Sequence, residues 1–399
     1  MNRNDLCHEV RQRLARLPEP YASHYGVIPA PPPTSGVSVL PVAERHTRAI
    51  EALARIETLV EEGTDSYLVS RILARQEAVS SSAVEGTHST LDEILSVEES
   101  DSVEGSGEMS VAAKQVKNYA AALDALIPLA RKHGYSIFTD DLISLLHKKV
   151  MMGDPSYKDV PGEIRHRVVC IGGLDISRSI WNPPPPLDVR RCLAETINYI
   201  QCDEMSRHHQ SFLTRIAVSH SHFESVHPFS DGNGRVGRLL IPLMMAAEGR
   251  APLYLSPYIE THKNEYYAAL KASQQRLEWH EIIGFVSDAV ICAASEIMTT
   301  RRALNNLKLI WKQRRRFRLG SAALSALSLL SDYPVLTVSR LASMLDVTFR
   351  AANIAIEQLC DASILRERTG HSRNRIFAAD EALNIMNRPF GERPLLPDR

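Results

Sequence analysis

The sequence lacks the features that would place it in several large classes of protein. Its 46 basic and 47 acidic residues leave a formal net charge of −1, so the chain as a whole is not drawn to nucleic acid or to an anionic membrane. The 6 cysteines include no C-x-x-C pair, and no signal peptide opens the chain, which predicts a reducing cytoplasm as its location. No apolar run approaches the roughly 20 residues that span a bilayer, so we expect no membrane partner.

Metal-ligand spacing is missing as well. The chain has 15 histidines, but the neighbours His208 and His209 would point apart on a helix, and the others do not recur at the intervals of a zinc site. What is present is a chain of 399 residues, 44% of them hydrophobic, which is long enough for two or three domains with a sizeable core. The chemistry must therefore be sought in local motifs.

One stretch of consecutive residues concentrates the chemistry of the chain. It reads His227-Pro228-Phe229-Ser230-Asp231-Gly232-Asn233-Gly234-Arg235-Val236-Gly237-Arg238. Gly232 and Gly234 leave the backbone free to turn its amides toward an anion, and Asp231 can hold a divalent cation. The arginines offer planar forks for phosphate oxygens, and His227 has the one side chain whose unperturbed pKa suits proton transfer near neutral pH. An ordinary turn explains each residue singly but not their co-occurrence, so the stretch predicts a site that handles phosphate.

Helical periodicity surrounds this stretch. Apolar residues recur at helical spacing in residues 42–62, 67–84, 111–132, 140–151, 211–224 and 234–247. The stretch therefore lies at the N-terminus of a helix, where free amides and the helix dipole favour anions. The proline-rich residues 28–33 are expected to lie extended on the surface, and the acidic residues 98–109 are expected to form a loop.

The stretch resembles the signature of the Fic family, H-x-F-x-[DE]-G-N-G-R-x-x-R, at every specified position. The resemblance continues into residues 223–226 before it and residues 255–259 after it, and covers roughly residues 28–285. It implies a mainly α fold, a Fic-type helical bundle with a β-hairpin flap. The activity that it implies is transfer of AMP from ATP to a hydroxyl side chain of a target protein, with release of pyrophosphate.

The same resemblance assigns roles to the residues of the stretch. His227 becomes the general base that takes the proton of the incoming hydroxyl, and Asp231 becomes the ligand of Mg²⁺ between the α- and β-phosphates of ATP. The phosphate contacts fall to Gly232, Asn233, Gly234, Arg235 and Arg238. Phe229 is expected to lie in the core and to fix the loop, because phenylalanine prefers burial.

A change of period between residues 162 and 186 predicts a short β-hairpin arm around residues 168–173. This arm matches the flap of the Fic family, which clamps the target. An extended edge can accept a strand of another protein through main-chain hydrogen bonds and so present a Tyr, Ser or Thr to the base. The candidate residues are Val169, Cys170, Ile171 and Gly172.

Tyr266 and Tyr267, on the helix after the stretch, look like the adenosine contacts of the family. The alternative is an ordinary amphipathic helix with one of the two tyrosines in the core.

A second motif lies far upstream. Residues 81–86 match the inhibitory-helix pattern of the family, [ST]-x-x-x-E-[GN], and helical spacing puts Ser81 and Glu85 on the same face. The resemblance implies that Glu85 pairs with Arg238 and blocks the seating of the γ-phosphate. The predicted enzyme is therefore autoinhibited.

The last hundred residues predict a separate unit. A basic helical connector covers residues 301–318, followed by helices over 337–345 and 348–361 and strands near 365–368 and 375–378. This order resembles a winged helix. The predicted domains are thus an N-terminal arm with the inhibitory helix (residues 1–110), the Fic catalytic core (111–305) and a winged helix-turn-helix domain (319–386).

Two other readings of the chain stay open. The same scaffold can transfer other phosphate-containing groups, or remove AMP. The winged helix can instead bind DNA in a nucleotide-sensing regulator, for which Arg350, Asn353, Arg373 and Arg375 are the candidates. Residues 321–379 hold 6 arginines and 5 acids, which is not a strongly basic footprint, so contact with a protein or with a second copy of the chain is an equal alternative.

Overall fold

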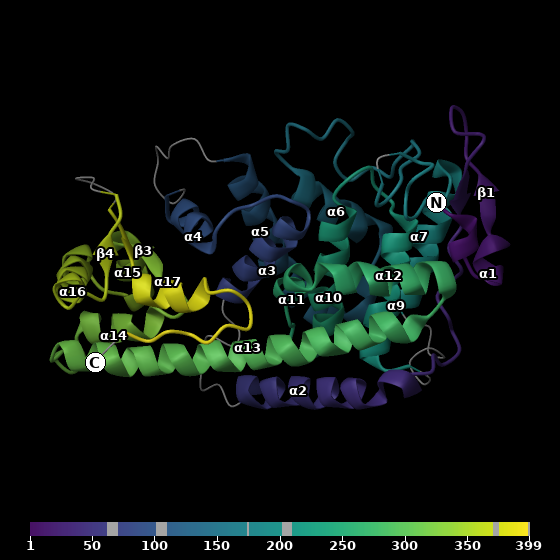
Figure 1. Cartoon of the computed structure of the whole chain (residues 1–399). Helices are drawn as coiled ribbons and strands as arrows, with labels where there is room; N and C mark the ends of the chain where they lie inside the picture. Colours follow the sequence, from purple (N-terminus) through teal and green to yellow (C-terminus); the bar gives the residue numbers. More distant parts are fainter. Residues whose placement is uncertain (62–70, 101–109, 174, 202–209, 370–374, 398–399) are drawn as a thin grey trace.

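The computed structural model describes residues 1–61, 71–100, 110–173, 175–201, 210–369 and 375–397, and its architecture is mainly α-helical, as predicted (Figure 1). It begins with an N-terminal arm. The arm contains the short helix α1 (His8–Arg11) and the antiparallel pair β1 (Leu14–Arg16) and β2 (Tyr25–Val27). The proline-rich residues 28–33 are neither helix nor strand, as their composition predicted.

The bundle that follows is built from long helices. They are α2 (Ala43–Glu61), α3 (Arg71–Val84), α4 (Leu91–Ser100), α5 (Val111–His133), α6 (Asp140–Met151), α7 (Pro186–Gln201), α9 (Phe212–Val226), α10 (Asn233–Ala247), α11 (Ser256–Thr261), α12 (Lys263–Arg276) and α13 (Trp279–Arg314). The predicted helices agree with these bounds within two residues, except that residues 67–70 lie outside the described part. Ser110, Thr139 and Ser211 set three of the starts, because each hydroxyl accepts the backbone N–H three residues on. Residues 98–100 of the predicted acidic loop are instead the last residues of α4, and residues 101–109 also lie outside the described ranges.

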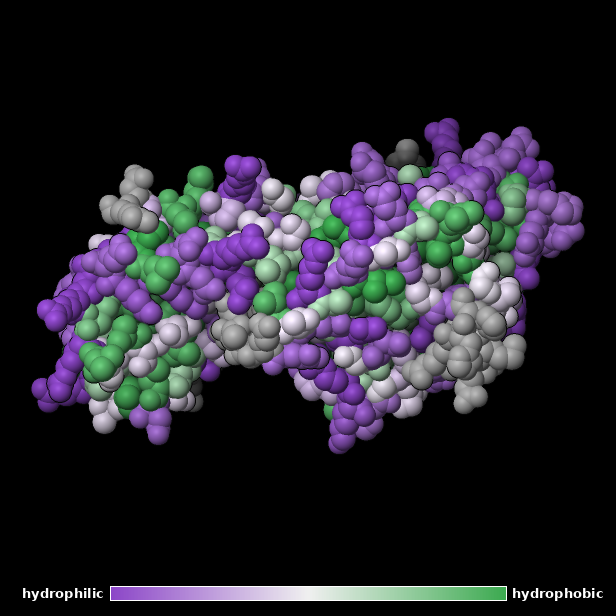
Figure 2. Space-filling view, turned by 90° about the horizontal axis from the view of Figure 1, so that it is seen from below, coloured by the Kyte–Doolittle hydropathy of each residue, from purple (hydrophilic) through white to green (hydrophobic). Residues whose placement is uncertain are grey.

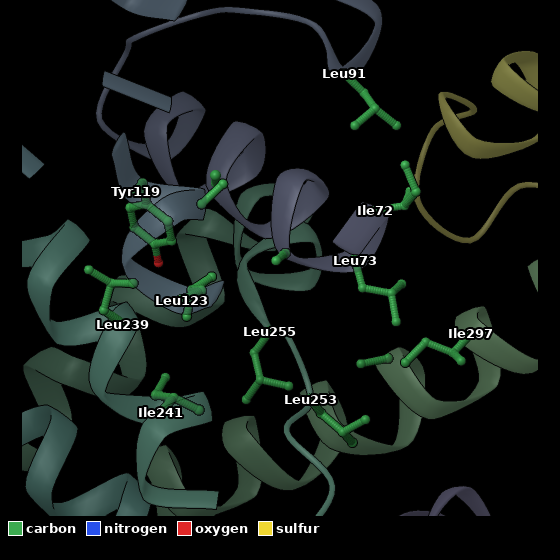
Figure 3. Packing of buried hydrophobic residues seen from close by; sticks show 14 of the residues in the cluster. Ile72, Leu73, Leu91, Tyr119, Leu123, Leu239, Ile241, Leu253, Leu255 and Ile297 are labelled. Atoms are coloured by element: carbon green, nitrogen blue, oxygen red, sulfur yellow. The ribbon is translucent and has the colours of Figure 1, made fainter. Parts of the chain in front are cut away.

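Helix α3 lies in the middle of the shared core. Figure 3 shows Ile72 near Leu91 of α4, and Leu73 on the side of Ile297 of α13 and Leu253 of the segment before α11. All of these residues belong to one core cluster with residues of α5 and α10. Ile72 is fully buried, and Leu73 is 7% exposed. Because close-packed neighbours leave little room for movement, this packing fixes the position of α3 relative to the predicted site.

Helix α13 corrects one expectation from the sequence. By length and composition it could cross a membrane, since its most apolar window has a mean hydropathy of 1.6. Asp288 and Glu296 interrupt residues 282–299, but two charged residues are too few to bring the mean hydropathy of that run below the range of membrane-spanning helices. Of that window, 61% is buried inside the structure, where α13 packs against α2, α9 and α12, as a core helix does. Figure 1 shows α13 running along the base of the molecule with α2 beside it.

The C-terminal unit, residues 322–386, forms a separate lobe, at the left in Figures 1 and 2. It contains α14 (Ala322–Leu329), β3 (Val335–Thr337), α15 (Val338–Leu345), α16 (Phe349–Asp361), β4 (Arg366–Glu367), β5 (Ile376–Ala378) and α17 (Asp380–Met386), with an antiparallel sheet in the order β3-β5-β4. Thr337 and Thr348 cap α15 and α16, at the predicted starts of the two helices. Residues 370–374, which include Arg373, lie outside the described ranges. Residues 301–314 of the predicted connector are the end of α13.

This unit contacts the bundle through α3 and α4 and also through the end of α13, where Arg314 pairs with Glu381 at 2.6 Å. Gln76 donates to the carbonyl of Met386 at 2.8 Å, and Arg340 forms an ion pair with the buried Glu99 at 3.2 Å. A further ion pair joins Arg368 to Asp92 at 3.1 Å. The C-terminal unit is thus attached to the same helix, α3, that carries the predicted inhibitory motif.

Candidate active site

The signature forms a tight loop between α9 and α10. His227 ends α9 in the left-handed region, with φ of 48°, and Gly232 begins α10 with φ of 78°. The side chain of Asn233 closes the loop, because its Oδ1 accepts from the N–H of Phe229 at 2.9 Å and its Nδ2 donates to the carbonyl of Phe229 at 2.8 Å. Asn233 is buried and its polar atoms are engaged there, so its contact with phosphate stays a prediction.

Phe229 and His147 support this loop from below. Phe229 is fully buried, as predicted, and stacks on the ring of His147 with 3.7 Å between ring centroids. Nδ1 of His147 accepts from the N–H of Gly162 at 2.8 Å, so Nε2 carries the proton and donates to the carbonyl of Asp231 at 3.1 Å. Burial lowers the pKa of His147 to about 4, which keeps it neutral. No sequence pattern predicts this role of His147, because its partners are an aromatic ring and backbone atoms that are distant in the chain.

The inhibitory motif and the signature meet at the N-terminus of α10. Arg238 is 1% exposed, and its Nη2 donates to Oε1 of Glu85 at 2.7 Å. Its Nε donates to the hydroxyl of Ser81, and Nη2 donates to the carbonyl of Ser81, both at 2.9 Å. A Cβ placed on Gly234 would lie 2.1 Å from Oε1 of Glu85. The carboxylate of Glu85 thus lies against the start of α10 and beside the Arg238 guanidinium, and a side chain at position 234 would displace it.

Charge stabilises this contact. Burial disfavours the charged form of Glu85, but the Arg238 guanidinium more than offsets it, so the pKa of the Glu85 carboxyl lies below its usual value. Burial likewise disfavours the charged form of Arg238, and Glu85 is the leading influence that raises the pKa of this arginine. Both groups are therefore charged at neutral pH.

A buried glutamate anchors the same face of α3. Glu77 is 1% exposed and accepts from the N–H of Ser256 at 2.9 Å, its hydroxyl at 2.6 Å and the hydroxyl of Tyr119 at 3.2 Å. Glu77 and Ser81 lie four residues apart on one face of α3, and Glu85 follows directly after the last residue of that helix. The anchor therefore holds the helix face that leads to both predicted inhibitory residues. The anchor was not found from the sequence, because a lone glutamate on a helix is usually exposed.

His227 is half-buried at the entrance to this site. Burial, and after it the Arg165 guanidinium, lower its pKa to about 4, although Glu85 and the backbone carbonyl of Glu224 act in the opposite direction. His227 is therefore neutral at physiological pH and able to accept a proton.

The remaining polar residues of the signature differ in exposure. Asp231 is exposed, and its Oδ1 accepts from the N–H of Gly232 at 2.6 Å. Arg235 is 4% exposed and points inward, where Nη1 donates to Gln115 at 3.3 Å and Nη2 lies 3.2 Å from the sulfur of Met151. Its phosphate contact therefore stays a prediction, for which the side chain would have to leave these partners.

The predicted flap is shorter than a hairpin ladder. In its described residues a single antiparallel bridge joins Ile171 to Trp181, with the N–H of Ile171 donating to the carbonyl of Trp181 at 2.9 Å. Gly172 has φ of 66°, which suits the turn, and Val169 and Cys170 are partly buried. Residue 174 lies outside the described ranges.

The two tyrosines of α12 differ in exposure to solvent. Tyr266 is 2% exposed, and its hydroxyl lies 2.7 Å from Nε2 of His220, so it belongs to the core. Tyr267 is 48% exposed, which leaves it as the tyrosine of the pair able to meet a ligand from solvent. The adenosine contacts predicted for Tyr266 and Tyr267 stay a prediction.

One carboxylate of the signature, that of Asp231, is placed where it could bind a metal ion. Within the described ranges there is no group of three or more His, Cys, Asp or Glu residues that could hold an ion. Mg²⁺ bound with a nucleotide commonly takes one or two protein carboxylates and otherwise phosphate and water oxygens. The exposed Asp231 beside the helix N-terminus fits that requirement.

Comparison with known proteins identifies the family to which these regions are similar. The model of the Fic/DOC family matches residues 137–245, and the model of the Fic/DOC family N-terminal region matches residues 43–126. Protein adenylyltransferase fic-1 of Caenorhabditis briggsae is 32% identical over 142 residues, which are 36% of this chain and 25% of that protein. The probable protein adenylyltransferase aq_aa38 of Aquifex aeolicus is 24% identical over 223 residues, which are 55% of this chain and 59% of that protein. The chain thus spans from a quarter to three fifths of the length of these relatives.

Solved structures support the fold. A Fic family protein from Desulfovibrio desulfuricans G20 superposes with a TM-score of 0.54 at 18% identity, covering 88% of this chain and 98% of that one. Residues 134–508 of Fic-1 from Caenorhabditis elegans superpose with a TM-score of 0.50 at 23% identity, covering 64% and 73%. With the complete signature in its loop and the two matching family models, the chain contains a Fic/DOC domain over residues 137–245, preceded over residues 43–126 by the N-terminal region of that family.

Proposed function

We propose that the chain transfers AMP from ATP to a hydroxyl side chain of a target protein and releases pyrophosphate. The observation that carries this proposal is the position of His227. It is a neutral base in the loop just before α10, and the N-terminus of α10 already contacts the carboxylate of Glu85. The printed names of the relatives, protein adenylyltransferases, support the same class of reaction. The hydroxyl oxygen attacks the α-phosphorus, the bond to the β-phosphate oxygen breaks, and the hydroxyl proton passes to the imidazole of His227.

The chain is proposed to stabilise the transition state mainly through hydrogen-bond donors that are already in position. The amides at the start of α10, around Gly234, and the guanidinium of Arg238 face the developing negative charge, where preorganised donors are most effective. Asp231 is the proposed ligand of Mg²⁺, which supplies neutralisation of phosphate charge when bound. Flap residues 169–172 are proposed to hold the target strand by backbone hydrogen bonds.

We further propose that this state is autoinhibited by Glu85. Its carboxylate is itself an anion at the position that suits a phosphate oxygen, 2.7 Å from Arg238. Two anions cannot share one guanidinium without repulsion, so the γ-phosphate and Glu85 exclude each other. The anchoring of α3 by Glu77 supports this role, because it holds the helix face that leads to Glu85.

Removal of AMP is the second candidate activity, and the position of Glu85 favours it. A carboxylate beside the base can also orient a water molecule toward a modified hydroxyl. Under this alternative, replacing Glu85 would abolish activity, whereas under the proposed function it would raise it.

For the C-terminal unit we propose a winged helix that contacts a protein. Arg375 binds Asn353 at 3.2 Å and Glu367 at 3.4 Å, and Arg366 forms an ion pair with Asp380. Arginines that already form ion pairs within the protein attract DNA phosphates less strongly. DNA binding would contradict this assignment and would be detected as a salt-dependent shift of random duplex DNA.

The test of the proposed function uses ATP labelled on either the α- or the γ-phosphate. The protein and a cell lysate are incubated with Mg²⁺ and each nucleotide in parallel. The α-label should enter protein and the γ-label should leave as pyrophosphate, and neither should be retained with His227→Ala. Retention of the γ-label instead would identify phosphate transfer and refute the proposal.

A further inference from the structure

Arg165 is a buried arginine with an unusual set of partners. It lies just before the flap and is 3% exposed. In the described part of the chain no acidic side chain forms an ion pair with it, and burial lowers its pKa to about 10. Burying a cation without a carboxylate partner costs free energy. The hydrogen bonds of Arg165 must therefore offset that cost by stabilising the fold or the site.

The hydrogen bonds of Arg165 go to backbone carbonyls on two sides of the site. On the side of the catalytic loop, Nε donates to the carbonyl of His227 at 2.8 Å and Nη2 to that of Val226 at 3.5 Å. On the side of the flap, Nη1 donates to the carbonyl of Arg167 at 3.0 Å and Nη2 to that of Pro184 at 2.9 Å. One planar guanidinium thus joins the base to both ends of the flap.

The backbone of Arg165 adds to this connection, since its N–H donates to the carbonyl of Pro228 at 3.0 Å. His227 between these contacts has φ of 48°, a left-handed conformation that a residue with a side chain adopts only where its surroundings enforce it. The carbonyl of His227 is held by Arg165, so the same guanidinium stabilises the backbone turn that aims the imidazole.

We propose that Arg165 is a positioning residue that holds the flap and His227 at one fixed separation. The inference rests on the proposed function. A target strand docked on residues 169–172 brings its hydroxyl to His227 only if that separation is correct, and a misplacement of about 1 Å can reduce the rate roughly 10²-fold. We assign Arg165 a positioning role because its side-chain hydrogen bonds go to backbone carbonyls of the chain itself.

The charge of Arg165 gives a second, separable effect. After burial, it is the main influence that lowers the pKa of His227 to about 4. The other groups that face the imidazole are the carboxylate of Glu85 and the backbone carbonyl of Glu224, and both raise that pKa. Removing the cation should therefore raise the pKa of His227, whereas replacing arginine by lysine should keep it low.

The experiment compares Arg165→Lys and Arg165→Gln in a Glu85→Gly background, with self-modification by α-labelled ATP as the reaction. Both variants should lose transfer by roughly 10²-fold, because neither side chain has the planar fork, while ATP affinity stays within about twofold. Arg165→Gln alone should shift the pKa of His227, read from the NMR titration of its ring, upward by about 1 unit.

The matched control is Arg215→Lys. Arg215 is just as buried, at 1% exposed, but binds the carbonyl of Ile200 at 3.3 Å and Glu248 at 3.4 Å, away from the signature loop. The Arg215→Lys variant should melt at a lower temperature, but the pKa of His227 and the rate of AMP transfer per folded molecule should not change. Transfer by both Arg165 variants at the parent rate, or an unchanged pKa of His227 in Arg165→Gln, would overturn the proposal.

The two proposals fail in different ways. If the Glu85→Gly parent incorporates no AMP, the proposed function is refuted. The NMR titration does not depend on transfer and still decides whether Arg165 acts on the base.

Discussion

Replacing Glu85 by glycine should accelerate AMP transfer, because its carboxylate lies against Arg238 and the start of α10, where a phosphate oxygen would bind. Nη2 of Arg238 and Oε1 of Glu85 are 2.7 Å apart. A Cβ placed on Gly234 would lie only 2.1 Å from the same oxygen of Glu85. After the substitution, Arg238 keeps both hydrogen bonds to Ser81 and so stays oriented toward the vacated position.

The size of the effect follows from the contact. Hydrogen bonds to charged groups contribute about 1.5 to 3 kcal/mol. The Glu85 side chain is 34% exposed, so screening by water puts this contact at the lower end of that range. About 1.5 kcal/mol corresponds to roughly a tenfold increase in rate, if loss of this contact is the main barrier.

The assay is the initial rate of AMP incorporation from α-labelled ATP, measured for the wild type, Glu85→Gly and the double variant Glu85→Gly, Arg238→Ala. The double variant should lose the gain, because the freed guanidinium is then absent. Glu57→Gln is the matched control, since it weakens a comparable contact, with Arg250 at 3.0 Å, outside the site, and should leave the rate unchanged. A folded Glu85→Gly protein with a rate at or below that of the wild type would refute inhibition by this residue.

The other predictions concern the base, the metal, a buried acid and the C-terminal unit. His227→Ala should reduce transfer by roughly 10²- to 10⁴-fold while calorimetry shows ATP still binding, and a normal rate would remove it from the mechanism. Chelation of Mg²⁺ or Asp231→Ala should suppress transfer, and Mn²⁺ should restore the chelated enzyme; activity in excess chelator would contradict this. Burial raises the pKa of Glu224 to about 8 from 4.5, so the folded state binds the extra proton and its stability falls as pH rises through that window; Glu224→Gln should flatten this dependence in thermal melts, and an unchanged profile would show that Glu224 does not cause it. A chain ending near Arg301 should retain transfer but melt at a lower temperature, because contacts of α3 and α4 with the C-terminal unit are lost, and a folded but inactive truncation would show that catalysis requires that unit.

The parts of the site that were predictable are those encoded locally. The signature loop, the caps of the helices and the meeting of Glu85 with Arg238 could be expected from the sequence, because each depends on residues within a few turns or on a recognisable family pattern. Phe229 was expected in the core for its chemistry alone, and it lies there.

The rest depends on contacts between distant segments through backbone atoms, which leave no pattern in one sequence. His147 and Arg165 hold the loop through the carbonyls of Asp231 and His227, and such acceptors are present at every residue. Glu77 likewise has its value only because Ser256 happens to meet it across the core. The flap was expected as a hairpin, but its short strands form one bridge, since strand propensity does not determine how many residues pair.

The measurement that tests the central claim most directly is intact-mass spectrometry of the Glu85→Gly protein after incubation with ATP and Mg²⁺, followed by fragmentation to locate the modified residue. We predict a gain in mass of one AMP on a serine, threonine or tyrosine, and no gain when His227→Ala is added. A gain of phosphate, or the same gain of AMP without His227, would contradict the account.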